Sequence, residues 1–377
     1  MRSSRIAGIV VKVAELCNLN CTYCYMYNHA DQSFRQRPKL MTRECFEMLL
    51  QRLDDYVSDH GYEYVDLAFH GGEPMLMNVN EFRAMAEMAR SRFEDRLRLS
   101  LSIQTNATLV TDEWVKALRD CQVQVGVSLD GSRDVHDTLR VGKNGKGSYY
   151  QVIEGIRRLR GGGVWPSVLC VINPEANGLQ VYTHFRELEF AAMDFLIPEV
   201  SHDCRNTVLL HEKPTPVADY LIPIFNEWFK ADDPQIYIRL FESIIRLLLG
   251  STSYTQAVGA GPKNYIVVET DGSVHGDDCL KVCDEGLSNT GLNIFHNSIN
   301  ELFACNNVAT FGVLGALKPA KECVTCPEFS VCGGGSVPNR YSTARGFDNP
   351  SVWCTDLKKL IAHIRNATSG GVDAHVQ

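Results

Sequence analysis

Three cysteines near the start of the chain are spaced so that they could hold a metal centre. The segment reads Cys17-Asn-Leu-Asn-Cys21-Thr-Tyr-Cys24, a CxxxCxxC pattern. Three thiolates can hold three irons of a 4Fe-4S cube, and because such a cluster needs four ligands, one iron is left open to react. The alternative is a zinc knuckle, but zinc ligands usually come as two CxxC pairs. Nothing nearby completes a tetrahedral set, so the spacing favours a reactive iron–sulfur cluster.

A second group of cysteines lies near the C-terminus. Cys323-Val-Thr-Cys326 is followed by Cys332 and then by Cys354. Four thiolates complete the ligand shell of a cluster and leave no iron open, so electron transfer and structural support are the expected roles. By composition alone these four residues also fit a zinc ribbon.

Charge and composition exclude some partners and favour others. The net charge of −8 argues against a nucleic-acid partner, because phosphate binding requires a basic face. The apolar run from Ile6 to Val13 is interrupted by Lys12 and is too short to span a bilayer, so we expect no membrane association. Fourteen cysteines without a secretion signal indicate metal or redox chemistry rather than disulfides, and we expect a cytoplasmic location.

Strand and helix patterns alternate along the first half of the chain, which predicts a parallel α/β sheet with right-handed crossovers. The expected strands are Ile6–Val13, Tyr64–Phe69, Leu97–Thr105, Val123–Leu129, Val168–Ile172 and Met193–Ile197, each followed by a loop or an amphipathic helix. Six units are fewer than the eight that close a barrel. A doubly wound open sheet is the alternative.

The residues after these strands are candidates for ligand binding, because ligands of parallel α/β folds collect at the C-terminal ends of the strands. They are Gly71, Gly72, Glu73, Thr105, Asn106, Ser128 and Asp130. Arg140 follows a little later, and its fork of donors suits a carboxylate. The plainer interpretations are a tight turn at the glycines and a surface ion pair at Arg140.

The chain after residue 215 no longer shows the alternation of strands and helices. Pro216–Phe229 and Ile236–Leu249 are amphipathic and predict two helices, and the runs on either side of Asp271-Gly272 predict a β-hairpin. We therefore expect a barrel domain at residues 1–215, a helical bridge at 216–262 and a cysteine-rich domain at 263–377. An edge of the hairpin near Tyr265 to Val274 could accept a peptide strand.

The CxxxCxxC motif, with Tyr23 directly before its last cysteine, resembles the signature of radical S-adenosylmethionine (SAM) enzymes. The resemblance implies a partial (β/α)6 barrel, SAM bound at the open iron, a 5'-deoxyadenosyl radical that removes a hydrogen atom from a substrate, and an external low-potential electron donor. It also implies that the Gly71-Gly72-Glu73 backbone meets the SAM amino group and that Tyr23 packs near adenine. Thr105 and Asn106 lie in the same site, and Glu73, Ser128, Asp130 and Arg140 would position SAM.

The C-terminal segment from Cys332 through Arg340-Tyr341 to Cys354 resembles SPASM-domain maturases, which carry auxiliary 4Fe-4S clusters, and in particular those that form cyclophanes in ribosomally made peptides. Those enzymes join an aromatic ring carbon to the β-carbon of a nearby residue. In members with two auxiliary clusters a further cysteine lies four residues beyond the equivalent of Cys332, and here that position is Ser336. We therefore expect one auxiliary cluster. Cys279, Cys283 and Cys305 could still supply thiolates, so a second auxiliary cluster stays open.

The resemblance leads to a prediction of function. We expect a radical SAM maturase that cross-links a precursor peptide, with Asp277 and Asp278 as candidate bases because formylglycine-forming relatives use an aspartate beside an auxiliary-cluster cysteine. The alternatives are formylglycine formation on a sulfatase or thioether formation on a peptide. A non-catalytic metal-binding or redox-sensing scaffold is the alternative from a different class.

Overall fold

The structure is a computed structural model and describes residues 6–94, 96–204, 213–315 and 317–370. The chain divides into two compact units that interleave along the sequence. Unit 1 comprises Met1–Ser128, Leu139–Pro166 and Pro262–Ala316, and unit 2 comprises Leu129–Thr138, Ser167–Gly261 and Leu317–Gln377. Because the chain enters each unit more than once, residues far apart in the sequence meet within one unit.

Unit 1 is built on a sheet whose central strands are parallel. Its strand order is β10 (Asn289–Asn293), β9 (Ser273–His275), β8 (Tyr265–Val268), β1 (Gly8–Ala14), β2 (Tyr64–Gly71), β3 (Arg98–Thr105) and β4 (Gln124–Ser128). Strands β8 to β4 run parallel, whereas β9 and β10 are antiparallel to their neighbours. Burial alternates along β2 and β3, as expected for strands with one face in the core.

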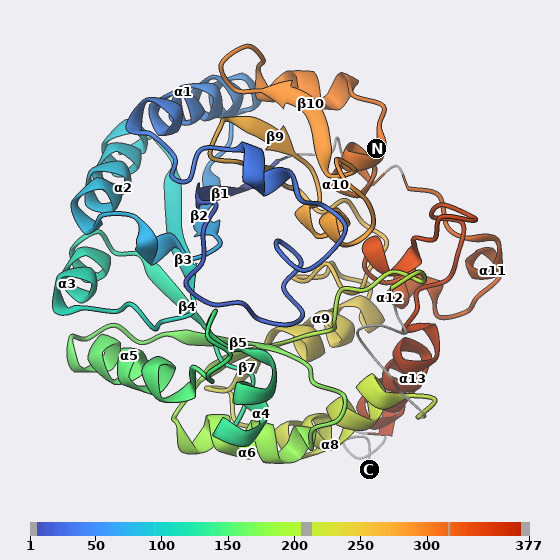
Figure 1. The fold of residues 1–377 in the computed structure, drawn as a ribbon. Coiled ribbons are helices and arrows are strands. Elements are labelled where there is room, and N and C mark those ends of the chain that lie inside the picture. Colours follow the sequence, from blue (N-terminus) through green and yellow to red (C-terminus); the bar gives the residue numbers. More distant parts are fainter. Residues whose placement is uncertain (1–5, 95, 205–212, 316, 371–377) are drawn as a thin grey trace. The chain divides into compact units, whose positions relative to one another are not determined.

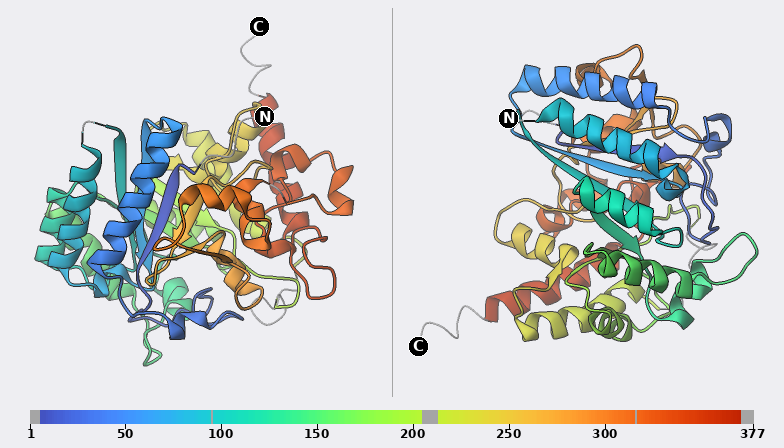
Figure 2. Two further views of the ribbon diagram at one scale, coloured as in Figure 1. Left: turned by 90° about the horizontal axis from the view of Figure 1, so that it is seen from above. Right: turned by 90° about the vertical axis from the view of Figure 1, so that its left-hand side faces the viewer.

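Three helices of unit 1 lie side by side along these strands (Figures 1 and 2). They are α1 (Arg43–His60), α2 (Val79–Phe93) and α3 (Asp112–Asp120). Helix α1 begins where the Thr42 side chain accepts a hydrogen bond from the Cys45 amide, and it ends at Gly61 in the left-handed conformation. The other elements of unit 1 are α5 (Tyr149–Gly161), α10 (Val308–Leu314) and the 3-10 turns η1 (Ser33–Gln36), η2 (Pro74–Leu76), η3 (Asp278–Val282) and η4 (Ile299–Ala304).

Unit 2 contains three parallel strands and most of the C-terminal helices. The strands are β5 (Ser167–Val171), β6 (Ala192–Leu196) and β7 (Tyr237–Ile238). The helices are α4 (Arg133–Leu139, whose last residue belongs to unit 1), α6 (Gly178–Glu187), α8 (Pro216–Ala231), α9 (Arg239–Leu248), α11 (Lys321–Val324), α12 (Phe329–Cys332) and α13 (Cys354–Gly370), with the turn η5 (Pro338–Arg340). Helix α8 packs against both α6 and α13 (Figure 1).

All six predicted strands are present within a few residues of their expected bounds. The helix expected over Ile236–Leu249 begins only at Arg239, because Tyr237 and Ile238 pair with β6 as strand β7. The hairpin also forms, but its expected role is wrong. Strand β8 pairs with β1 on one side and β9 on the other, and β9 also pairs with β10, so neither has a free edge for a peptide.

None of the helices in the described residues combines the length and the apolar composition that spanning a bilayer requires.

Candidate active site

The loop that carries Cys17, Cys21 and Cys24 follows the C-terminal end of β1, where the sequence placed it. Backbone hydrogen bonds hold its shape: the Cys24 amide donates to the Cys21 carbonyl oxygen at 3.0 Å, and the Thr22 amide donates to the Leu139 carbonyl oxygen at 2.9 Å. We call residues 15–28 the cluster loop. Its path brings the three cysteines close enough for their charges to interact.

Two glycines at the end of β2 let the cluster loop pass close to the sheet. A Cβ on Gly72 would lie 1.9 Å from the Tyr27 hydroxyl and 2.3 Å from the Leu16 carbonyl oxygen. Gly71 has a φ of +140°, and a Cβ there would lie 2.2 Å from the Ala14 carbonyl oxygen. Any larger residue at either position would displace the loop, so the glycines have a clear structural function.

The three thiols are poor candidates for ordinary free cysteines. Burial, with a smaller contribution from negative charge on Glu73, Cys21 and Cys24, raises the pKa of Cys17 to about 12. Ionising all three thiols together would therefore be unfavourable without a bound cationic group. This set of donors fits an iron–sulfur cluster, because thiolates are the ligands that such clusters take.

Glu73 uses its carboxylate to join the ends of two strands. It is only 1% exposed and accepts hydrogen bonds from the Thr105 hydroxyl and the Asn106 amide, each at 2.7 Å, and from the Met75 amide at 3.0 Å. Burial raises the pKa of Glu73, although these hydrogen bonds oppose the rise. The structure thus brings together Glu73, Thr105 and Asn106, and the carboxylate is occupied by its own chain.

The Asn106 side chain connects this strand end to the cluster loop. Its amide nitrogen donates to Asn18 Oδ1 at 2.9 Å and lies 3.8 Å from Cys17 Sγ. Asn18 in turn donates to the Thr108 hydroxyl at 2.8 Å. Asn18 was not singled out in the sequence, where it is one of several polar residues between the cysteines.

Tyr23 and Arg140, both expected near SAM, contact each other in unit 1. Arg140 Nη1 donates to the Tyr23 hydroxyl at 2.6 Å, and the guanidinium lies 6.0 Å from the centre of the Tyr23 ring. Ser128, at the end of β4, accepts a hydrogen bond from Gln104 Nε2 at 2.8 Å. Arg140 is 8% exposed, so the interpretation as a surface ion pair does not hold.

Asp130 belongs to unit 2. Its Oδ1 accepts a hydrogen bond from the Val171 amide at 3.0 Å, and its own amide donates to His136 Nδ1 at 3.3 Å. These contacts fix the turn after β4 against β5 within that unit.

A buried group of charged residues lies in unit 1, and the sequence did not predict it. Lys12, in β1, is fully buried; its Nζ lies 2.6 Å from Asp278 Oδ2 and 2.8 Å from the Tyr25 hydroxyl, to which it donates. The Tyr25 hydroxyl donates to Asp278 Oδ2 at 2.8 Å, and Lys12 Nζ also lies 3.2 Å from His70 Nδ1. We call Lys12, Tyr25, His70 and Asp278 the polar cluster.

The charges within the polar cluster are well defined. Burial acts to raise the pKa of Asp278, but the charges of Lys12 and Lys281 and the hydrogen bond from Lys12 together outweigh it, and the pKa is lowered to about 2. Burial together with Lys12 lowers the pKa of His70 to about 3, so this imidazole is neutral. The cluster therefore holds an ionised carboxylate next to the cluster loop, because Tyr25 directly follows Cys24.

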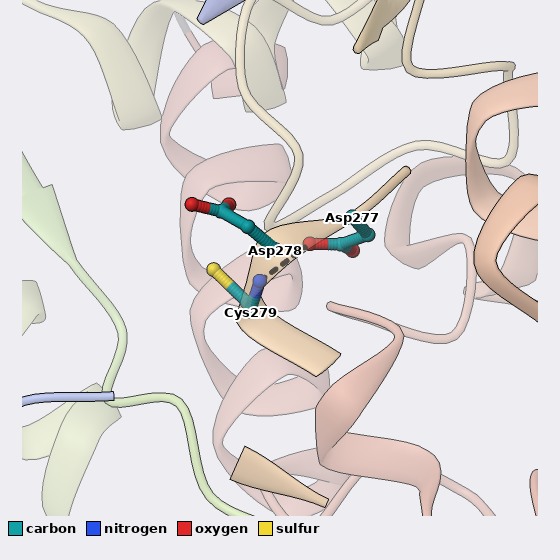
Figure 3. Close-up of side chains that lie close together, drawn as sticks. All are labelled: Asp277, Asp278 and Cys279. Carbon is teal, nitrogen blue, oxygen red and sulfur yellow. Dashed lines mark hydrogen bonds between the residues drawn. The ribbon is translucent and has the colours of Figure 1, made fainter. Parts of the chain in front are cut away.

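The two aspartates predicted as bases have different partners. Asp277 is 1% exposed and forms an ion pair with Lys263 at 2.5 Å, whereas Asp278 contacts Lys12 and Tyr25. Figure 3 shows Asp278 and Cys279 extending to one side of the turn and Asp277 to the other, with Asp277 accepting from the Cys279 amide at 3.2 Å. The three ligand atoms lie within 4.8 Å of one another, but the lysines already neutralise both carboxylates.

The four C-terminal cysteines line one cavity in unit 2. It has about 290 Å³ of empty space, part of it open to solvent, and its wall comprises Cys323, Cys326, Glu328, Phe329, Cys332, Gly334, Ser351, Cys354 and Lys358. Burial raises the pKa of Cys332 to about 12, and charges on the other three cysteines add to that effect. As at the cluster loop, four gathered thiols of this kind fit a bound cationic group.

Ser336 makes a hydrogen bond in place of the thiolate that a second auxiliary cluster would need. Its hydroxyl donates to Glu199 Oε1 at 2.7 Å within unit 2. Cys279, Cys283 and Cys305 are in unit 1 and partly exposed. Their part in a second cluster remains a prediction.

Residues 11–177 match the Radical SAM superfamily. These residues form a radical SAM domain. A radical SAM domain binds a 4Fe-4S cluster and SAM, which confirms these two predicted cofactors. The parallel sheet confirms the predicted α/β fold, and the C-terminal cysteines fit an auxiliary cluster.

Curated relatives resemble the chain over nearly its whole length. The serine-type anaerobic sulfatase-maturating enzyme of Bacteroides thetaiotaomicron is 28% identical over 375 residues, covering 94% of this chain and 88% of the relative. The cysteine-type anaerobic sulfatase-maturating enzyme of Clostridium novyi is 27% identical and covers 94% of each. The chain is thus a homologue of these maturating enzymes and, with a radical SAM domain at residues 11–177, is an enzyme rather than a non-catalytic scaffold.

Solved structures support the same fold. Native anSMEcpe with bound AdoMet has a TM-score of 0.83 at 25% identity, covering 97% of this chain and 99% of that one. SuiB of Streptococcus suis bound to its precursor peptide SuiA has a TM-score of 0.64 at 14% identity, covering 93% and 76%. The second likeness concerns the fold alone.

Proposed function

We propose that this enzyme is a maturase of a ribosomally synthesised precursor peptide, and that it links an aromatic ring carbon to the β-carbon of another residue to form a cyclophane. The observation that carries the proposal is the polar cluster, which holds the ionised Asp278 beside the loop of Cys17, Cys21 and Cys24. Support for a peptide or protein substrate comes from relatives named as sulfatase-maturating enzymes.

The proposal assigns the cysteine sets and the strand-end residues to the binding of cofactors. Cys17, Cys21 and Cys24 would hold the SAM-binding cluster, and Cys323, Cys326, Cys332 and Cys354 the auxiliary cluster. When bound, these groups and SAM supply a 5'-deoxyadenosyl radical and one-electron transfer. The backbone of Gly71, Gly72 and Glu73, with Tyr23, Thr105, Asn106, Ser128, Asp130 and Arg140, would position SAM.

Asp278 is the stronger of the two candidates for proton acceptor. When a β-carbon radical adds to an aromatic ring carbon, the ring must later lose a proton and an electron. The auxiliary cluster would accept the electron, and a nearby ionised carboxylate is needed to accept the proton. Both carboxylates form an ion pair, Asp277 with Lys263 and Asp278 with Lys12. Asp278 differs in that it also accepts a hydrogen bond from Tyr25 on the cluster loop. Tyr25 and Lys12 orient the Asp278 carboxylate through hydrogen bonds.

The C-terminal sequence favours the cyclophane over other products. The segment from Cys332 to Cys354 resembles cyclophane-forming maturases, and Ser336 stands where members with two auxiliary clusters have a cysteine. An external low-potential electron donor is part of the proposal.

Formylglycine formation is the second candidate, because the relatives that cover most of the chain are sulfatase-maturating enzymes. Both reactions begin with loss of a hydrogen atom from a side-chain β-carbon, so the same site could serve either. A thioether cross-link to a peptide cysteine is the remaining alternative. Product analysis separates the three.

The test is anaerobic co-expression with short peptides encoded beside the gene, followed by mass spectrometry. A cyclophane removes two hydrogens, leaves a fragmentation gap that includes an aromatic residue, and does not react with aldehyde or thiol reagents. A product that reacts with a hydroxylamine probe would identify formylglycine and overturn the cyclophane. A gap ending at a cysteine that resists alkylation would identify a thioether.

Two variants check the assignment of the base. Asp278→Asn should abolish the mature product while SAM cleavage continues, because hydrogen abstraction does not require the carboxylate. Asp277→Asn is the matched control, since it changes the neighbouring aspartate. Equal loss of product in both variants would contradict the choice of Asp278.

A further inference from the structure

Arg340 is a buried cation in unit 2 that forms no ion pair with a carboxylate among the described residues. It is 3% exposed, and its Nη2 donates to two neutral acceptors, the carbonyl oxygens of Lys318 at 2.5 Å and Phe347 at 2.9 Å. Its Nε is buried and makes no hydrogen bond within residues 6–94, 96–204, 213–315 and 317–370. Isolating a charge in this way is costly unless a charge of opposite sign lies nearby.

The position of Arg340 identifies where that opposite charge would be. Gly334 lines the cavity of the four cysteines, and a Cβ on Gly334 would lie 3.6 Å from Arg340 Cδ and 3.7 Å from its Nη1. The guanidinium therefore lies immediately behind the cavity wall. Burial lowers the pKa of Arg340, and negative charge at Cys323, Asp348 and Cys332 opposes this.

The other charged groups near the cavity do not replace Arg340 in this position. Asp348 is on the surface, where Lys321 and Arg345 each lie 3.8 Å from its carboxylate. Glu328 lines the cavity but forms an ion pair with Arg365 at 2.5 Å. Lys358 also lines the cavity and adds a second positive charge there.

We propose that Arg340 is the internal counter-charge of the auxiliary cluster and sets its reduction potential. One-electron reduction adds a negative charge to a cluster that four thiolates already make anionic. A buried guanidinium stabilises the reduced form more than the oxidised form, because the interaction grows with the charge and is weakly screened inside the protein. Arg340 thus makes the auxiliary cluster easier to reduce. The proposal rests on the cofactor assignment and is independent of which peptide is modified.

The test measures the midpoint potential of the auxiliary cluster by redox titration with electron paramagnetic resonance. The background is full-length protein carrying Cys17→Ala, Cys21→Ala and Cys24→Ala, so that only the auxiliary cluster contributes. Arg340→Met should lower the equilibrium constant for reduction at least tenfold, which corresponds to a fall of at least about 59 mV in the midpoint potential of a one-electron couple. Arg345→Met is the matched control, because this arginine is 44% exposed on the same segment and solvent screens its charge.

Arg340→Lys separates charge from packing. It keeps the positive charge but loses the fork of donors, so its potential should stay nearer to that of the parent protein than to that of Arg340→Met. Loss of the cluster from Arg340→Met with retention in Arg340→Lys would also support the proposal. The proposal would be overturned by equal shifts of the midpoint potential in Arg340→Met and Arg345→Met. Equal shifts in the two Arg340 variants, or loss of the cluster from both, would also overturn it. The same holds for zinc in place of iron at this site.

Discussion

At the scale of single residues, the chain carries several polar groups that are buried among charged neighbours. Lys12 and Glu73 are each at most 1% exposed, and each has partners contributed by distant parts of the sequence. Sequence patterns identified Glu73 because it follows a glycine pair at a strand end. They missed Lys12, although a lysine within an otherwise apolar strand is itself a signal that a buried acid must lie nearby.

Replacing Glu73 should destabilise unit 1. Glu73→Gln puts an amide where the carboxylate now accepts three hydrogen bonds, and we expect a loss of about 1.5–3 kcal/mol in the free energy of unfolding. Urea denaturation of the cluster-free protein measures it. Glu81→Gln is the control, since its pair with Arg43 is about half exposed and should contribute roughly 0–1 kcal/mol. Equal losses in the two variants would contradict the importance of burial.

His275 should make stability depend on pH. It is fully buried, and burial lowers its pKa to about 4. The charges of Lys281 and Arg37 add to this decrease, whereas those of Glu269 and Asp271 oppose it. The His275 imidazole takes up a proton near pH 6.5 in the unfolded chain and near pH 4 in the folded chain. The contribution of His275 to the free energy of unfolding is therefore complete above pH 6.5 and is lost as the pH falls from 6.5 to 4.

The corresponding variant is His275→Gln. Between pH 7 and pH 5.5 it should lose about 1 kcal/mol less stability than the wild type, since glutamine does not titrate. Urea denaturation at the two pH values gives the comparison. Identical losses in the two proteins would show that His275 takes up a proton without cost. The pKa of His70 is also lowered, so the stability of His275→Gln should still depend in part on pH.

At the scale of elements, the cluster loop depends on the close approach permitted at the end of β2. Local sequence patterns predicted the strands and most helices, because hydrophobic periodicity and turn residues are local signals. Cysteine spacing also predicted the two groups of thiols, of which the C-terminal four line one cavity. Local patterns did not predict that β8 pairs with β1, since a local signal does not specify which distant strand completes a sheet.

Gly72→Ala should interfere with the cluster loop directly. Its new methyl group would lie 2.3 Å from the Leu16 carbonyl oxygen, so the loop must move and iron at the SAM-binding site should fall by at least half. Gly161→Ala is the control, because a Cβ there meets nothing within 4 Å. Iron analysis after anaerobic reconstitution, with the change in the resonance spectrum on adding SAM, measures the effect. Full iron content and a normal SAM response in Gly72→Ala would show that the loop tolerates the displacement.

At the scale of the whole molecule, the cysteine sets lie in different units and should load independently. With one SAM-binding and one auxiliary cluster, the reconstituted protein should contain about eight irons per chain. Replacing Cys17, Cys21 and Cys24 with alanine should leave about four irons and abolish the spectral response to SAM. About twelve irons in the wild type would instead require a second auxiliary cluster and bring Cys279, Cys283 and Cys305 back as ligands.

The pairing of β1 with β8 also has a consequence for how the protein is made. Strand β1 leaves the ribosome long before its neighbour β8, which begins only at Tyr265, and before the acidic partner of Lys12 at Asp278. During most of translation, one edge of β1 is therefore uncovered and the Lys12 ammonium lacks the Asp278 carboxylate. Exposed strand edges favour aggregation. The nascent chain is thus most vulnerable to aggregation just before the segment from residue 262 emerges, and chaperone binding would be most useful at that stage of synthesis.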